Sequence, residues 1–300
     1  MASARAVPVR ARLPVKPPPF AYHAPTTMDE ALALVGELGD EAAILAGGQS
    51  LIPLLNLRLA RPAAVVDIGR IPGLDGIDVD RDGITCGAMA RAADLERNPE
   101  ASAALPCLAE ALHVLGHPQI RNRTTVGGNV AHADPASELP AVLVAMDGVV
   151  SLRSASRGAR QVAAADFFRS VYVTARAPDE IVTEVRFPRF PGRSTFLELA
   201  RRPGDFALVG ACVGVATEDT TARDVRIAVC GAGERAVRLA TAEAVLVGRP
   251  VSEAAVVEAA GVARTSVVPL EDLGGSAEYR AAMVEVLVAR GLRRAAGVSR

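Results

Sequence analysis

The chain has 300 residues, of which 50% are hydrophobic and 22% are charged, and its formal net charge is −1. This composition supports a large buried core and excludes disordered and collagen-like chains, and the length favours two domains. A balanced charge with 3% aromatic residues and no Trp argues against a nucleic-acid partner, because such proteins need a basic surface and stacking side chains.

The cysteines and the start of the chain indicate the cellular setting. Cys86, Cys107, Cys212 and Cys230 are widely spaced, so we expect no metal site but buried thiols in a reducing compartment. Residues 1–15 are rich in Arg and Pro without the apolar core of a secretory signal, which predicts a disordered tail. Since the longest near-apolar stretch, 207–216, is too short to cross a bilayer, we predict a cytoplasmic protein with no transmembrane segment.

The first half of the chain alternates predicted strands with predicted helices. Thr27 and Glu30 have the spacing of a capping box, and apolar residues follow at helical spacing until Gly39. Ser50 is placed to cap a second helix, and the leucine spacing predicts one helix over 103–115. We expect strands at 20–23, 42–46 and 64–68, and a hairpin with an Asp-Gly turn over 77–86.

The second half separates strands from helices. Strand-like segments cover 149–186, and the residues Pro188, Pro191 and Gly192 indicate an interdomain link. Strands are then expected at 195–200, 207–216 and 225–229, and helices at 241–246, 252–263 and from Ala277, where Tyr279, Met283, Val286 and Leu287 share a face. A block of strands followed by a block of helices favours an α+β chain of two domains.

Two double-glycine segments are the first candidates for a binding site: Ala46-Gly47-Gly48-Gln49-Ser50 and Thr125-Val126-Gly127-Gly128-Asn129. Glycine lets backbone N–H groups approach a ligand, and successive N–H groups can form an anion-binding concavity. One such turn is commonly just a strand–helix connection. Two of them, flanked by hydroxyl and amide side chains, suit one long ligand with two phosphates, although neither is a Rossmann or P-loop motif.

Two further segments leave their roles open. Asp134 and Glu138 can cap a helix that starts near Pro135, or can accept hydrogen bonds from ribose or ribityl hydroxyls. The segment 201–207, Arg-Arg-Pro-Gly-Asp-Phe-Ala, is either a polar turn or a surface that faces a ligand or partner. No Ser, Cys or paired-carboxylate arrangement supports nucleophilic catalysis, so no catalytic residue is assigned.

Four segments together carry a family resemblance, and they span most of residues 16–294. They resemble FAD-binding medium subunits of molybdenum hydroxylases of the aerobic carbon monoxide dehydrogenase and xanthine dehydrogenase type. The segments are AGGQSLIPLLNLRLARPAAVVDIGRI (46–71), TVGGNVAHADPASELPAVL (125–143), RRPGDFALVG (201–210) and SAEYRAAMVEVLVARGL (276–292).

The resemblance implies a fold and a set of FAD contacts. The expected fold is a two-lobed, vanillyl-alcohol-oxidase-like (PCMH-type) FAD-binding domain over 16–190, followed by a smaller α+β domain over 191–300. Glu138 matches an acidic FAD contact, Val182 an apolar one, and Asp134 lies in a matching segment. The aromatic side chains that could shield the flavin ring are Phe196, Phe206 and Tyr172. The residues implied to hold the FAD diphosphate and adjoining groups are Ala46, Gly47, Gly48, Gln49, Ser50, Leu51, Thr125, Val126, Gly127, Gly128 and Asn129.

The resemblance also implies partners. A molybdopterin-containing large subunit would oxidise the substrate, a small subunit would carry two [2Fe-2S] clusters, and this chain's FAD would pass electrons to an external acceptor, in a dimer of heterotrimers. The hard chemistry then belongs to the flavin. A stand-alone flavin-dependent oxidase or reductase, and a non-catalytic assembly protein, are the alternatives.

Overall fold

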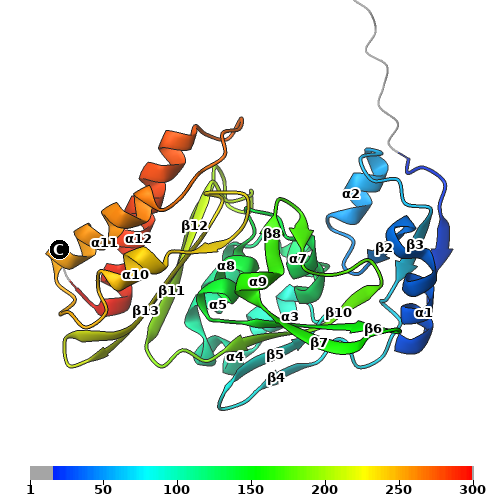
Figure 1. The fold of residues 1–300 in the computed structure, drawn as a ribbon, viewed down its shortest axis with the longest axis horizontal. Coiled ribbons are helices and arrows are strands. Elements are labelled where there is room, and N and C mark those ends of the chain that lie inside the picture. The colour runs from blue at the N-terminus through cyan, green and yellow to red at the C-terminus, as the bar shows by residue number, and fades with distance from the viewer. Residues whose placement is uncertain (1–15, 299–300) are drawn as a thin grey trace, which may run out of the picture.

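The computed structural model describes residues 16–298, so the tail expected at residues 1–15 lies outside the described part of the chain. Three successive parts follow one another along the long axis of the molecule (Figure 1): a three-stranded sheet, a five-stranded sheet, and a four-stranded sheet covered by long helices. This arrangement confirms the α+β class. No helix in the described range is both long and apolar enough to span a membrane.

The first part is a parallel sheet in the order β1-β3-β2, with α1 packed against it. Its elements are β1 (Ala21–His23), α1 (Met28–Leu38), β2 (Ala42–Leu45), α2 (Leu51–Asn56) and β3 (Ala64–Asp67). The predicted capping box at the start of α1 is confirmed: Thr27 Oγ1 accepts from the Glu30 N–H at 3.2 Å, and the Glu30 carboxylate accepts from the Thr27 N–H at 3.3 Å.

The middle part is an antiparallel sheet in the order β4-β5-β10-β6-β7. Its strands are β4 (Ile77–Val79), β5 (Gly83–Gly87), β10 (Glu180–Pro188), β6 (Val149–Ser154) and β7 (Gly158–Ala163), with a small β8 (Phe168–Ser170) and β9 (Val173–Thr174) hairpin nearby. Its helices are α3 (Ala92–Arg97), α4 (Pro99–Ala104), α5 (Pro106–Val114), α6 (Pro118–Arg121), α7 (Val126–His132), α8 (Glu138–Ala145) and α9 (Ala164–Phe167).

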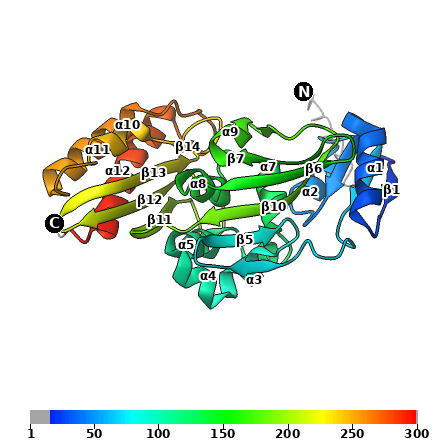
Figure 2. The ribbon, with the colours of Figure 1, turned by 60° about the horizontal axis from the view of Figure 1, so that its bottom comes forward.

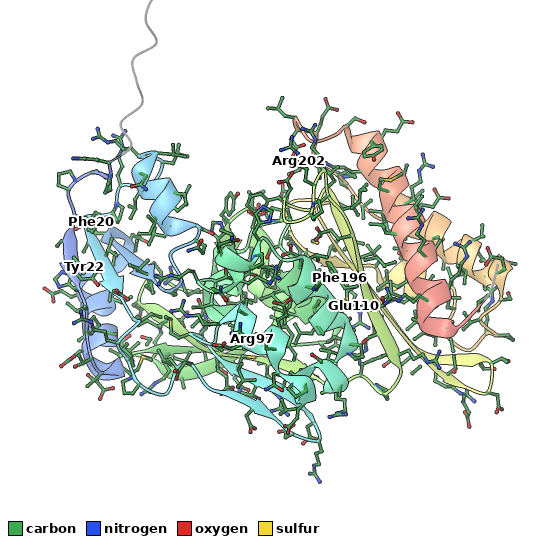
Figure 3. The ribbon with its side chains drawn as sticks, turned by 180° about the vertical axis from the view of Figure 1, so that it is seen from behind. Phe20, Tyr22, Arg97, Glu110, Phe196 and Arg202 are labelled. Atoms are coloured by element: carbon green, nitrogen blue, oxygen red, sulfur yellow. The ribbon has the colours of Figure 1, made fainter. Side chains whose placement is uncertain are left out.

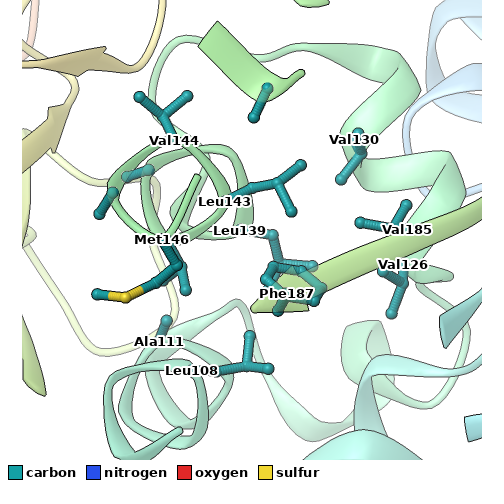
Figure 4. Close-up of a cluster of buried hydrophobic side chains, with 14 of the residues drawn as sticks. Leu108, Ala111, Val126, Val130, Leu139, Leu143, Val144, Met146, Val185 and Phe187 are labelled. Carbon is teal, nitrogen blue, oxygen red and sulfur yellow. The ribbon is translucent and has the colours of Figure 1, made fainter. Parts of the chain in front are cut away.

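One helix prediction in this part is wrong. The single helix expected over 103–115 is two helices, because α4 ends at Ala104 and α5 begins at Pro106. Proline cannot donate the helical hydrogen bond and suits the first turn of a new helix. Figure 4 shows the core that results, where Leu108 of α5, Leu139 and Leu143 of α8, and Phe187 of β10 pack together.

The last part is the antiparallel sheet β11-β12-β13-β14. Its elements are β11 (Arg193–Leu199), β12 (Val209–Glu218), β13 (Thr221–Cys230), β14 (Val237–Arg238), α10 (Ala240–Ala244), α11 (Glu253–Thr265) and α12 (Ala277–Ala296). The face expected for the last helix is only partly right. Leu287 is buried and Met283 and Val286 are half-buried, but Tyr279 is exposed, and Val284 and Val288 supply the rest of the buried stripe.

The two faces of this sheet have different neighbours (Figure 2). Val209, Ala211 and Val213 of β12 pack with α11 and α12, whereas Cys212 belongs to the core of the middle part. Glu110 of α5 joins the two parts by accepting hydrogen bonds from Thr195 Oγ1 and the Phe196 N–H at 2.7 and 2.8 Å (Figure 3). The sheet therefore rests directly on α5 and α8. The four cysteines are free and buried, as predicted.

Candidate functional site

The first glycine segment forms the loop between β2 and α2, and its backbone donors are unpaired. Within residues 16–298, the N–H groups of Gly47, Gly48, Gln49 and Ser50 donate to no protein acceptor. Gly48 has a φ of 77°, a conformation that glycine adopts without strain. Four successive unpaired N–H groups in a turn are the donors of an anion site.

The predicted cap of α2 is wrong. Ser50 occupies the position before the helix, which begins at Leu51, but its side chain makes no capping hydrogen bond. The reason is its backbone, with φ −101° and ψ −49°. A capping side chain reaches the N–H groups of the first turn from an extended backbone, not from a helical one.

The second glycine segment was expected to be a turn. In the structure it is instead the start of α7. Thr125 caps this helix by accepting from the Gly128 N–H, and Gly127 and Gly128 lie in the first turn. Its N–H groups therefore have protein partners and do not form a free cradle. The hydrogen bonds run from Val126 N to Ala90 O (2.9 Å), Gly127 N to Ala88 O (2.9 Å), Gly128 N to Thr125 Oγ1 (3.2 Å) and Asn129 N to Thr125 O (2.9 Å).

The structure nevertheless brings the two glycine segments together. A Cβ at Gly47 would lie 2.3 Å from Arg123 O and 3.1 Å from Thr125 N. A Cβ at Gly128 would lie 3.3 Å from the Cβ of Ala46. The loop after β2 therefore packs against the start of α7 so closely that a side chain at position 47 has no room.

A cavity of about 570 Å³ opens beside the first loop. Three arginines, Arg70, Arg91 and Arg123, line it together with one carboxylate, Asp67. Burial and the positive charge of Arg123 lower the pKa of Arg91, whose guanidinium donates to the Arg123 carbonyl oxygen. The other lining residues are Leu45, Ala46, Gly47, Gly48, Gln49, Ile52, Pro53, Gly69 and Met89.

This cavity fits the diphosphate of a dinucleotide. Its unpaired N–H groups and excess of arginine side chains are the groups that bind phosphate oxygens. Its size is in the range of ligand pockets in proteins. Among the described residues, no group of three or more His, Cys, Asp or Glu side chains could hold a metal ion.

Asp134 has a structural role at the turn before α8. Its Oδ1 accepts from the Ala136 N–H at 2.9 Å, and its Oδ2 accepts from Tyr172 Oη at 3.4 Å. The His132 ring stacks on Tyr172, with 4.8 Å between the ring centres. The helix expected to start near Pro135 begins at Glu138 instead, because Asp134 holds residues 134–137 in a turn.

Glu138 is the buried acid of this region. It is the first residue of α8 and is 6% exposed. Burial, and next the neighbouring Glu198 carboxylate, raise the pKa of Glu138 to about 8. A carboxyl group that is protonated near neutral pH can donate a hydrogen bond as well as accept one.

Comparison with known proteins places this geometry in a family. Residues 18–190 match the FAD binding domain in molybdopterin dehydrogenase, and residues 194–295 match the CO dehydrogenase flavoprotein C-terminal domain. The chain belongs to this FAD-binding family. Both matches agree with the resemblance drawn from the sequence motifs.

Individual relatives extend over nearly the whole chain. The chain is 40% identical to the 6-hydroxypseudooxynicotine dehydrogenase complex subunit alpha of Paenarthrobacter nicotinovorans, over 94% of this chain and 96% of that protein. It is 38% identical to the carbon monoxide dehydrogenase medium chain of Hydrogenophaga pseudoflava, over 93% and 98%.

Solved structures agree with these matches. A structure of the Hydrogenophaga pseudoflava carbon monoxide dehydrogenase matches with a TM-score of 0.90 at 40% identity, over 93% of this chain and 98% of that chain. Quinoline 2-oxidoreductase from Pseudomonas putida 86 matches with a TM-score of 0.89 at 32% identity, over 94% and 98%.

The apolar and aromatic residues expected to contact FAD differ from one another in how exposed their side chains are. Val182 lies on β10, is 5% exposed, and belongs to the core rather than to the lining of the cavity. Phe196 is 4% exposed in the same core, so it is not free to cover a flavin ring. Phe206 and Tyr172 are 76% and 57% exposed and remain the candidates for that role.

The segment 201–207 is a turn between β11 and β12, with Arg202 at its tip (Figure 3). It is tied to the loop before α12, because Arg201 donates to the Leu273 carbonyl oxygen at 2.7 Å. These contacts show a polar turn, and Phe206 at the end of the same segment is 76% exposed, so the reading of a surface that faces a ligand or partner stays a prediction.

Four residues of this region were missed from the sequence. Arg70, Arg91 and Arg123 come from three separate segments, and Glu198 lies on a strand of the following part. None of them stands in a motif that indicates phosphate or proton chemistry. Two of them had a signal that could have been used: Arg70 lies in the segment 46–71, and Arg123 stands two residues before Thr125.

Proposed function

We propose that this chain is the FAD-carrying medium subunit of a molybdenum hydroxylase, and that it holds the FAD diphosphate in the cavity beside residues 46–51. The observation that carries this proposal is the set of four unpaired N–H groups at residues 47–50 next to Arg70, Arg91 and Arg123. FAD supplies the electron-transfer chemistry when it is bound, and the protein supplies binding and orientation.

The two glycine segments have different roles in binding FAD. The loop at 46–51 supplies the main-chain donors, while the start of α7 fixes the position of that loop through the contact of Gly47 with Arg123 and Thr125. The Asn129 side-chain carbonyl accepts from Ser137 Oγ at 2.8 Å, which leaves its amide group to donate to the ligand. By the family resemblance, Glu138 of α8 would contact FAD beyond the cavity lining, with Asp134 holding the turn between α7 and α8, whereas Val182 stays in the core.

We propose the partners from the family. The large subunit would carry molybdopterin and oxidise the substrate, the small subunit would carry [2Fe-2S] clusters, and the assembly would be a dimer of heterotrimers. Electrons would pass from the clusters to FAD and then to an external acceptor. The domains would cover 16–190 and 191–300, in keeping with the two family matches. Four free thiols support a cytoplasmic location.

Charge reversal in the cavity tests the proposal. Arg70 and Arg123 are exposed and line the cavity, so Arg70→Glu and Arg123→Glu should leave the fold intact. Each removes a charge-assisted contact worth about 1.5 kcal/mol, which is roughly a tenfold loss of FAD affinity. FAD binding to the apoprotein is measured by quenching of flavin fluorescence.

The matched control is Arg81→Glu, because Arg81 is a fully exposed arginine on the β4–β5 turn, away from the cavity lining. The proposal predicts that this control binds FAD like the wild type. Wild-type affinity in both cavity variants would contradict the diphosphate site. A purified chain that oxidises an organic substrate without partners would instead support a stand-alone flavin oxidase.

A further inference from the structure

An ion pair joins α3 and α6. Arg121, the last residue of α6, donates from Nε to Glu96 Oε2 of α3 at 2.7 Å. Its Nη1 donates to the carbonyl oxygens of Leu115 and Gly116, at 3.3 and 2.7 Å. The side chains of Glu96 and Arg121 are 22% and 11% exposed. The pair is therefore largely withdrawn from water.

The position of α6 depends on this pair. Of the four residues of α6, all within the described part of the chain, only Arg121 is buried. A cavity of about 530 Å³ lies beside the pair, lined by Glu96, Arg121 and other residues of α3, α5 and α6, so apolar packing does not fill this space. A buried charge that loses its partner is costly. Without Glu96, Arg121 would therefore turn toward water and release α6 from α3.

The same two segments carry arginines of the FAD cavity. Arg91 directly precedes α3, and Arg123 follows Arg121 by two residues. The Arg91 guanidinium donates to the Arg123 carbonyl oxygen. That carbonyl oxygen is also the atom that would lie 2.3 Å from a Cβ at Gly47. A shift of α6 relative to α3 therefore moves Arg123 against both Arg91 and the first glycine loop.

We propose that Glu96 and Arg121 are positioning residues of the FAD site: their ion pair fixes α6 against α3 and so holds Arg123 in place to bind the FAD diphosphate. This inference rests on the proposed function. Neither residue lines the FAD cavity, so both act through Arg123 rather than by touching FAD. A displaced guanidinium loses its charge-assisted contact with a phosphate oxygen, because such contacts weaken steeply with distance and angle.

The FAD affinity of the apoprotein, measured by quenching of flavin fluorescence, tests the proposal. Glu96→Ala removes the acceptor of Arg121 and should weaken FAD binding about tenfold, the loss expected for one charge-assisted contact. Glu96→Gln keeps a side-chain oxygen that can accept from Arg121 Nε, so it should restore most of the affinity. Wild-type affinity in Glu96→Ala would overturn the inference.

A double-mutant cycle tests whether Glu96 acts through Arg123. In the Arg123→Ala background the side chain that the ion pair holds in place is gone, so Glu96→Ala should reduce FAD affinity less than it does in the wild type. A merely destabilising change would weaken binding equally in both backgrounds, and that result would overturn the inference. If Arg123→Ala itself binds FAD like the wild type, the proposed diphosphate site fails as well.

Asp147→Asn is the matched control. Asp147 accepts from Arg226 and Arg238, whose side chains are 17% and 27% exposed, and none of the three lines the FAD cavity. Asparagine tolerates the left-handed backbone of this position, where φ is 52°. The control should bind FAD like the wild type. A loss equal to that of Glu96→Ala would show that loosening any ion pair weakens binding, and would contradict the inference.

Arg121→Lys covers the case in which Glu96→Ala does not fold. Lysine keeps the positive charge, but its single ammonium group cannot reach Glu96 and both carbonyl oxygens together. FAD affinity should then fall about threefold or more, because α6 is held less firmly against α3. Wild-type affinity in Arg121→Lys would show that the position of Arg123 does not depend on the ion pair.

Discussion

Replacing Gly47 by alanine perturbs the site with a single carbon atom. The added Cβ would meet the Arg123 carbonyl oxygen at 2.3 Å and the Thr125 nitrogen at 3.1 Å. Both neighbours are backbone, so they cannot turn aside as a flexible side chain would. An ordinary van der Waals contact of about 3.5 Å then requires the two segments to separate by about 1 Å.

This displacement should affect both stability and binding. Overpacking of this kind costs about 1–3 kcal/mol of folding free energy. The shifted loop also moves the N–H groups of residues 47–50 relative to Arg123, and the loss of one charge-assisted hydrogen bond at about 1.5 kcal/mol weakens FAD binding roughly tenfold.

Gly36→Ala supplies the matched control. Gly36 lies within α1, and a Cβ there would have no neighbour within 4 Å. Alanine should stabilise this helix by about 0.5–1 kcal/mol and leave FAD binding unchanged. Urea denaturation and fluorescence titration of both variants measure the two effects. Wild-type FAD affinity in Gly47→Ala would refute the reasoning that the two glycine segments must touch for the diphosphate to bind.

Three other predictions concern the rest of the chain. Thr27→Ala removes one half of the capping box and should lower the free energy of unfolding by about 1 kcal/mol, as measured by urea denaturation. The folded-state pKa values of Glu138 and Glu198 lie above the ordinary value of 4.5, so the native state binds more protons than the unfolded state. The contribution of these two residues to the free energy of unfolding should therefore fall as pH rises from 4.5 to about 8. Glu198→Gln should therefore show a smaller drop in urea midpoint between pH 6 and pH 8.5, and an equal drop would count against a raised pKa of Glu198. The four cysteines are buried, and burial raises the pKa of Cys86 to about 12. All four should resist a thiol reagent in the native protein and react after unfolding. Rapid labelling of the native protein would contradict their burial.

Much of the fold follows from local patterns in the sequence. The capping box at Thr27, the hairpin at 77–86 and the long strands of the last sheet are specified by neighbours in the chain, and the structure has each of them. Pro106 was a local signal as well, and it explains why one expected helix is two. The buried face of α12 depends instead on which side meets β12, which the periodicity alone did not fix.

The site was less predictable because its parts come from distant segments. The glycines at 47 and 48 were found from the sequence, since a loop between a strand and a helix has a known use. The helical conformation of Gly127 and Gly128 was not predicted. The Gly127 N–H donates to Ala88 O and the Gly128 N–H to Thr125 Oγ1, and the contact with Ala88 cannot be seen in the local sequence pattern. The arginines of the cavity meet the first loop only through the tertiary fold.

The central claim is that the unpaired N–H groups of residues 47–50 receive the FAD diphosphate. The most direct test is to follow the backbone amide resonances of Gly47 and Gly48 while FAD is added to the labelled apoprotein. The account predicts that both resonances shift strongly and saturate with the flavin fluorescence signal, and that ADP, which carries the same diphosphate, shifts them too. Unchanged Gly47 and Gly48 resonances at full FAD occupancy would contradict it.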